Sequence, residues 1–200
     1  SMYRKADISD AASMADLHRE GIPTGFLSSL KPELLVSLYG VIIEEGLSFV
    51  AVVDGKVIGF VSGTADSKAL YKRIIRKNFY KFIPLFFKKL LSYSFLKRSY
   101  ESFLIPYRTG NGGEKEKKIL PELLSIVISK DIQSKGTGTG LVECLESELR
   151  KRNIFSYKVL AGDNLVSANK FYFKNGFTLH EKLELHKGQI SNVYVKVLNG

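Results

Sequence analysis

The 200-residue sequence predicts an α/β fold in a single domain, with a mixed, mostly antiparallel sheet flanked by helices. Three segments carry this prediction. Residues 48–61 form a hairpin pattern around Asp54-Gly55, a pair typical of a two-residue turn. An apolar strand at 123–128 leads through a glycine-rich turn into an amphipathic helix. Alternating segments at 177–185 and 190–198 predict a closing hairpin.

The elements before the first hairpin are a strand and two helices. We expect the strand at 3–6 and a helix cap at Ser9 or Asp10. Glycine and proline punctuate a loop at 21–27. The second helix begins around Pro32, a residue that suits the first turn of a helix.

The elements after the glycine-rich turn alternate between helix and strand. The helix buries Leu141 and later leucines at helical spacing. A strand follows at 155–160, and then a helix at 165–175 that Gly176 ends as a C-cap glycine.

Residues 66–119 have a different composition and are predicted to be an insertion. Within it, residues 67–100 carry ten positive charges, no acidic residue and nine aromatic residues. Since the net charge is +10, the rest of the chain is neutral in sum. We expect basic amphipathic helices over 67–98, interrupted at Pro84, and then a mobile polar loop at 109–118.

Three interpretations of the role of this insertion are left open. The first is an extra helical pair with a solvated basic face, the second is a surface for peripheral membrane contact, and the third is a lid over an anionic acceptor. Nucleic-acid binding is the weakest interpretation, because nothing in the segment resembles a known reader module.

The glycine-rich turn predicts an anion site. Its sequence is Gln133-Ser134-Lys135-Gly136-Thr137-Gly138-Thr139-Gly140. Glycines allow close backbone approach, and the first amides of a helix favour phosphate groups. A Walker A loop is excluded because no lysine follows the glycines, and a dinucleotide fingerprint fails at Leu141.

Two motifs resemble the GNAT superfamily of acetyl-CoA-dependent N-acetyltransferases. The segment 133–138 matches its [RQ]-x-x-G-x-[GA] pattern after a strand, and 168–177 matches its A-x-x-[FL]-Y-x-x-x-G-F pattern. The resemblance covers 120–199 well and 3–65 loosely. It implies a GNAT fold whose sheet is splayed at 123–128, and acetyl-CoA as the co-substrate with no metal.

The resemblance also implies where the co-substrate binds. The turn 133–138, with Thr139 and Gly140 adjoining, would bind the CoA pyrophosphate. Backbone groups of Ile126, Val127 and Ile128 would pair with the pantetheine arm. Asn164 and Asn169 are further candidates on the cofactor side.

Tyr172 matches the general acid of the family, and Glu122 matches the place of a catalytic carboxylate. A phenol with a pKa of about 10 stays protonated at neutral pH and can protonate a departing thiolate. Glu122 could accept the amine proton directly or through water. We interpret His18 as a surface or satisfied histidine, and we give His180, His186 and Cys144 no chemical role.

The acceptor is expected to be a primary amine of a small molecule. A lysine amine is only about 0.04% neutral at pH 7, whereas an amine with a pKa of about 8 is about 10% neutral. The sequence shows no strong base, so an amino sugar or a nucleotide-linked amino sugar is favoured. Alternatives are protein or peptide N-acetylation and a non-catalytic CoA-binding module on a membrane. The acceptor is expected to meet the loop residues Pro23, Thr24, Gly25 and Phe26.

Cysteine content and hydropathy set the expected compartment. Cys144 is the single cysteine, so an internal disulfide is excluded and a reducing compartment fits. The sequence has neither a signal-peptide pattern nor an apolar run of 18 residues. We expect a cytoplasmic protein, with peripheral membrane contact through 67–100 as an alternative; the oligomeric state stays open.

Overall fold

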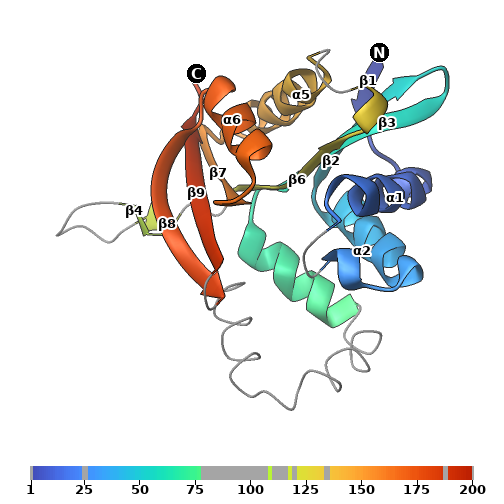
Figure 1. Ribbon diagram of the computed structural model, residues 1–200, viewed down its shortest axis with the longest axis horizontal. Helices are drawn as coiled ribbons and strands as arrows, with labels where there is room; N and C mark the ends of the chain where they lie inside the picture. Colours follow the sequence, from blue (N-terminus) through green and yellow to red (C-terminus); the bar gives the residue numbers. More distant parts are fainter. Residues whose placement is uncertain are drawn as a thin grey trace.

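The fold is that of a computed structural model (Figure 1). It describes residues 2–23, 27–77, 108–109, 117–118, 121–132, 136–186 and 189–199. Its helices are α1 (Ala11–Gly21), α2 (Pro32–Glu45), an unlabelled helix at 67–77, α5 (Thr137–Lys151) and α6 (Val166–Lys174). Its strands are β1 (Met2–Lys5), β2 (Leu47–Val53), β3 (Lys56–Thr64), β4 (Arg108–Thr109), β5 (Lys117–Lys118), β6 (Glu122–Ile128), β7 (Ser156–Gly162), β8 (Thr178–His186) and β9 (Gln189–Val197).

Seven strands form one sheet in the order β1-β2-β3-β6-β7-β9-β8. Every neighbouring pair is antiparallel except β6 and β7, which run parallel. The predicted mixed, mostly antiparallel sheet is therefore confirmed. The short strands β4 and β5 pair with each other in a separate sheet.

Helices cover both faces of the large sheet (Figure 1). On one face, α5 and α6 bury a core that includes Leu141, Leu145 and Tyr172. On the other face, α1 and α2 bury a core that includes Met14 and Tyr39. The sheet thus lies between two apolar layers, which is the usual solution for an α/β domain.

Two turns have the backbone conformations that the sequence predicted. Asp54 and Gly55 have φ values of 48° and 75° between β2 and β3, as a tight hairpin turn requires. Gly176 has a φ of 80° after α6, which confirms it as the glycine that ends this helix.

Asp10 is the N-cap residue of α1, one of the two predicted alternatives, but its side chain makes no capping hydrogen bond to this helix. A 3-10 turn at Ile8–Asp10 precedes α1, and the Asp7 carboxylate caps it by accepting the Ser9 amide at 2.8 Å. Asp10 instead binds the Arg4 guanidinium through two hydrogen bonds of 2.7 and 2.9 Å. Arg4 of β1 therefore binds the Asp10 carboxylate that the sequence pattern predicted to cap the helix.

The described start of the predicted basic insertion is a helix at 67–77. Leu70, Tyr71 and Ile74 lie on its inner face, at the spacing expected for an amphipathic helix. On its outer side, Arg73 pairs with Glu45 and Lys77 pairs with both Glu44 and Glu45. These ion pairs join the helix to α2. The rest of the predicted helical stretch, including the break at Pro84, and most of the polar loop at 109–118 lie outside the described residues.

Candidate active site

The large sheet opens between β6 and β7. The two strands pair only at Glu122 with Lys158 and at Leu123 with Val159. From Ser125 to Ile128, β6 pairs with β3 on its other edge, and no pairing with β7 is present. The predicted splay at this strand is therefore confirmed. The chain leaves the open ends of β6 and β7 toward α5 and α6 respectively, so both helix N-termini lie beside the gap (Figure 1).

Gly136 is the N-cap residue of α5, the helix that follows the open end of β6. Its φ of 77° is left-handed, and a Cβ atom placed on it would meet no heavy atom within 4 Å. No side chain of a described residue caps the helix at this position. The backbone here is therefore shaped for a helix N-terminus that faces open space, as an anion site requires. Gln133, Ser134 and Lys135 lie outside the described residues.

Gly138 and Gly140 belong to the first turns of α5 and are under a packing constraint. A Cβ atom on Gly138 would approach the ring of Phe171 in α6 to 2.8 Å. One on Gly140 would collide with the ring of Tyr3 in β1. Small residues at these two positions let α5 lie close to its neighbours.

Tyr172 points its ring into the core beside the gap. The side chain is 6% exposed and lies 5.3 Å from Phe177 and 5.7 Å from Tyr194, measured between ring centroids. Burial, with a further contribution from Tyr194, raises the pKa of the Tyr172 phenol. Tyr172 therefore stays protonated at neutral pH, and no hydrogen bond among the described residues uses its hydroxyl.

Asn169 is fully engaged within the protein. Its amide group donates to the carbonyl oxygens of Gly162 at 3.0 Å and Leu165 at 2.8 Å. Its side-chain oxygen accepts from the Tyr194 hydroxyl at 2.7 Å and from Asn192 at 3.1 Å. These bonds join α6 to the end of β7 and to the middle of β9.

Asn164 lies in the turn between β7 and α6, and its side chain is exposed. Its backbone oxygen accepts the Val166 amide at 3.0 Å. The exposed side chain therefore belongs to the turn that follows the open end of β7.

Glu122 is the first residue of β6 and is buried, with 9% of its surface exposed. The Tyr71 hydroxyl donates to its carboxylate at 3.3 Å, and the Lys158 ammonium lies 3.7 Å from the other oxygen. The Ser67 hydroxyl also favours the charged form of this carboxylate. Desolvation raises the pKa of Glu122, and Lys158 together with the two hydroxyls partly offsets this rise. A carboxylate of raised pKa is suited to accept a proton near neutral pH.

His18 is a satisfied core histidine, one of the two interpretations given to it. Its ring nitrogen Nδ1 lies 2.6 Å from the Tyr39 hydroxyl, and the side chain is 3% exposed. Tyr39 also hydrogen-bonds Ser125 of β6. Burial lowers the pKa of His18, so the ring is held neutral.

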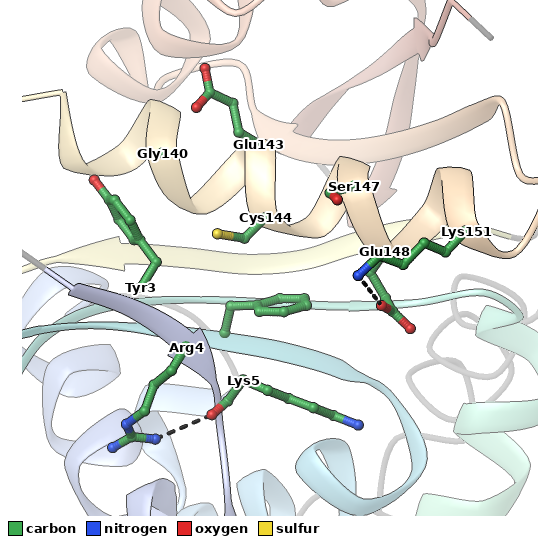
Figure 2. Close-up of a pocket in the computed structure, with 10 residues that line it drawn as sticks. Tyr3, Arg4, Lys5, Gly140, Glu143, Cys144, Ser147, Glu148 and Lys151 are labelled. Carbon is green, nitrogen blue, oxygen red and sulfur yellow. Dashed lines mark hydrogen bonds and ion pairs between the residues drawn. The ribbon is translucent and has the colours of Figure 1, made fainter.

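A groove of about 440 Å³ lies between β1 and α5, away from the gap (Figure 2). Of the predicted site residues it contains only Gly140, so it is not the candidate active site. Cys144 lines it and is half-buried. Burial and the nearby Glu143 charge raise the pKa of the thiol, which agrees with the absence of a nucleophilic role.

The described parts of the chain contain neither a metal-binding cluster of acidic, histidine and cysteine side chains nor a helix long and apolar enough to cross a membrane. In the predicted acceptor loop, Pro23 is exposed, and Thr24, Gly25 and Phe26 lie outside the described residues.

Sequence reasoning missed the side chains that surround Glu122 and Asn169. Only Lys158 carried a usable signal, because a lysine inside an apolar strand needs a buried partner. The others come from distant segments whose local patterns say nothing about this contact. The missed residues are Ser67, Tyr71, Lys158, Asn192 and Tyr194.

Comparison by sequence finds no matching family model and no matching curated protein. Comparison by structure finds proteins of the same fold. Ard1 from Thermoplasma volcanium has a TM-score of 0.62 at 14% identity, covering 100% of this chain and 98% of that chain. The PaiA N-acetyltransferase from Thermoplasma acidophilum, in complex with coenzyme A, has a TM-score of 0.58 at 15% identity, covering 98% of each chain.

A protein of the GNAT family from Desulfovibrio desulfuricans has a TM-score of 0.59 at 12% identity, with 99% of each chain covered. The structural similarity covers at least 98% of this chain in each case. The chain therefore has the fold of GNAT-family acetyltransferases.

Proposed function

We propose that this protein transfers an acetyl group from acetyl-CoA to the primary amine of a small molecule. The observation that carries the proposal is the gap between β6 and β7, with the N-terminus of α5 at its open end. A gap in a sheet offers unpaired strand edges to an extended, amide-containing ligand. The helix N-terminus beside it offers amides to a phosphate. Coenzyme A combines both groups in one molecule.

The binding roles follow from this placement. The turn from Gln133 to Gly138, with Thr139 and Gly140, would hold the pyrophosphate. Strand alternation directs the backbone groups of Ile126 and Ile128 toward the gap and those of Val127 toward β3. Of the three predicted residues, Ile126 and Ile128 would therefore pair with the pantetheine arm, and Asn164 would contact it from the end of β7. Since the Asn169 amide is already satisfied, we propose that it fixes the start of α6 instead of binding the co-substrate directly.

Two side chains would move the protons. Glu122, directly or through water, would accept the proton that the amine loses when its nitrogen attacks the thioester carbon. A backbone amide of β6 would polarise the thioester carbonyl. When the carbon–sulfur bond breaks, the Tyr172 hydroxyl would donate its proton to the departing sulfur. The products are an N-acetylated amine and CoA with a free thiol, so one proton leaves nitrogen and one reaches sulfur.

The acceptor class rests on the ionisation of the amine. An amine with a pKa of about 8 costs only about 1.4 kcal/mol to deprotonate at pH 7, against about 4.6 kcal/mol for a lysine side chain. A single buried carboxylate is sufficient to deprotonate an amine with a pKa of about 8. Deprotonating a lysine side chain would require a stronger base. Amino sugars and nucleotide-linked amino sugars are therefore our preferred acceptors over protein lysines.

Calorimetry and an acceptor screen test this function. Titration with CoA and acetyl-CoA should show one site, and absence of binding would refute the proposal. Turnover should then be followed as free thiol on three sets of amines: amino sugars, nucleotide-linked amino sugars and peptides. Acetylation of peptides alone would overturn the acceptor class. Binding without turnover on any amine would identify a CoA-binding module instead of an enzyme. Glu122→Gln should bind CoA as wild type does and turn over more slowly.

A further inference from the structure

The first helix of the basic insertion reaches the proposed general base. Helix 67–77 begins three residues after β3 ends, and its inner face carries Ser67 and Tyr71. The Tyr71 hydroxyl donates to the Glu122 carboxylate at 3.3 Å, and the Ser67 hydroxyl also favours the charged form of this carboxylate. Both Ser67 and Tyr71 lie outside the segments 3–65 and 120–199, in which the sequence resembles the GNAT family.

The helix is held where these contacts can persist. Leu70, between the two donors, is 2% exposed. On the side away from Glu122, Arg73 and Lys77 form ion pairs with Glu44 and Glu45 of α2. Packing on one side and ion pairs on the other restrict rotation of the helix. A side chain presented by such an element has a defined direction.

We propose that Tyr71, assisted by Ser67, is a positioning residue that orients the Glu122 carboxylate and favours its ionised form. The inference rests on the proposed function, in which Glu122 accepts the amine proton. A buried carboxylate prefers to be neutral, and donors aimed at its oxygens oppose this preference. Without them, Glu122 would stay protonated to higher pH and could not act as a base there.

Among the described residues, the charged and titratable groups that face Glu122 come from two elements. Lys158 of β7 supplies the positive charge, and Tyr71 of helix 67–77 supplies a hydroxyl. Lys158 approaches one carboxylate oxygen and Tyr71 the other. Tyr71 can therefore be changed without removing the ion pair, so its contribution can be separated from that of Lys158.

The primary test is a titration of the Glu122 carboxyl carbon by NMR in protein labelled with ¹³C-glutamate. Glu122→Gln identifies the signal by its disappearance. In Tyr71→Phe the midpoint should move to higher pH by about half to one unit, equivalent to roughly a three- to tenfold change in the ionisation constant. Ser67→Ala should move it in the same direction by less. Ile74→Val, which trims the same helix face without removing a donor, should leave it unchanged.

The pH dependence of kcat/KM, on whichever amine of the acceptor screen is acetylated, gives the second readout. In Tyr71→Phe the acid limb should move to higher pH while affinity for CoA is unchanged. A Glu122 midpoint in Tyr71→Phe that coincides with wild type would overturn the positioning role. So would an equal loss of rate at all pH values without a shift.

The two proposals fail in different ways. Full activity in Glu122→Gln would remove the assignment of Glu122 as the base, whatever Tyr71 does to its titration. Loss of activity in Glu122→Gln together with an unshifted titration in Tyr71→Phe would overturn only the role of Tyr71. The NMR measurement needs no acceptor, so it decides the effect of Tyr71 on the carboxyl even where no amine is turned over.

Discussion

At the scale of single residues, Gly55 provides a matched control for a substitution at Gly136. Both have left-handed φ values, of 77° and 75°, and at both a Cβ atom would meet nothing within 4 Å. The backbone strain that a side chain would introduce is therefore similar at the two positions. They differ only in place, because Gly55 lies in the turn between β2 and β3 whereas Gly136 precedes α5.

Gly136→Ala and Gly55→Ala should each lower the free energy of unfolding by about 1–2 kcal/mol, since alanine is disfavoured in the left-handed region. Only Gly136→Ala should also weaken CoA binding, because its methyl group projects into the space where a pyrophosphate would lie. Urea unfolding and calorimetry measure the two effects. Equal CoA affinity in the two variants would argue against an anion site at this helix terminus.

Tyr172→Phe separates the hydroxyl from the ring. The ring contacts with Phe177 and Tyr194 remain, so the unfolding free energy should change by less than about 1 kcal/mol. Loss of the proton donor should lower kcat by about 10²-fold with little change in CoA affinity. A steady-state assay that reads out free thiol decides this, and unchanged kcat would assign Tyr172 to the core alone.

At the scale of elements, His18 joins α1 to α2 through Tyr39 and thereby to β6. Because burial lowers the pKa of His18, the unfolded chain binds the proton more readily than the folded protein does. The stability from the neutral ring is therefore complete above the unfolded pKa of about 6.5 and is lost as the pH falls below it. Glu122, whose pKa is raised, titrates in the opposite sense, so only a comparison of variants isolates His18.

His18→Gln should show a smaller loss of unfolding free energy between pH 7.5 and 5.5 than wild type does. Glutamine keeps polar atoms for Tyr39 but removes the titrating group. Urea denaturation at the two pH values measures this. Parallel losses in both proteins would show that His18 does not control acid sensitivity.

The predictable elements are those whose patterns are local. The hairpin at Asp54-Gly55, the strand before the glycine turn and the helix that carries Tyr172 each follow from adjacent residues. Glu122 was predicted from its place in the strand, but its surroundings were not, because Tyr71 reaches it from 51 positions away. The cap at Asp7 was missed because a residue outside the local helix pattern, Arg4, binds the carboxylate of Asp10.

At the scale of the whole molecule, the positive charge of helix 67–77 divides into two sets. Arg73 and Lys77 are paired with acidic residues of α2, whereas Lys68, Lys72 and Arg76 are exposed. Only the second set is suited to meet an anionic surface without breaking the attachment to α2. Peripheral membrane contact through this helix is an alternative role of the insertion, and these three residues are where it can be tested.

Lys72→Glu with Arg76→Glu should weaken co-sedimentation with vesicles containing phosphatidylserine by at least about tenfold, at about 1 kcal/mol per basic residue. Lys5→Glu with Lys56→Glu, which changes the same net charge at exposed positions of β1 and β3, serves as the matched control. Vesicle binding equal to wild type in both double variants would refute contact through helix 67–77. An equal loss of binding in both would also refute it.

The parting of β6 and β7 also has a consequence for backbone dynamics. The Ser129 amide bonds Ile58 of β3, so strand alternation directs the Ile126 amide toward the gap. Without a ligand this amide should exchange its hydrogen with solvent faster than amides in the β3–β6 ladder. Bound CoA should slow that exchange, and the co-substrate would then complete the sheet as a non-peptide strand.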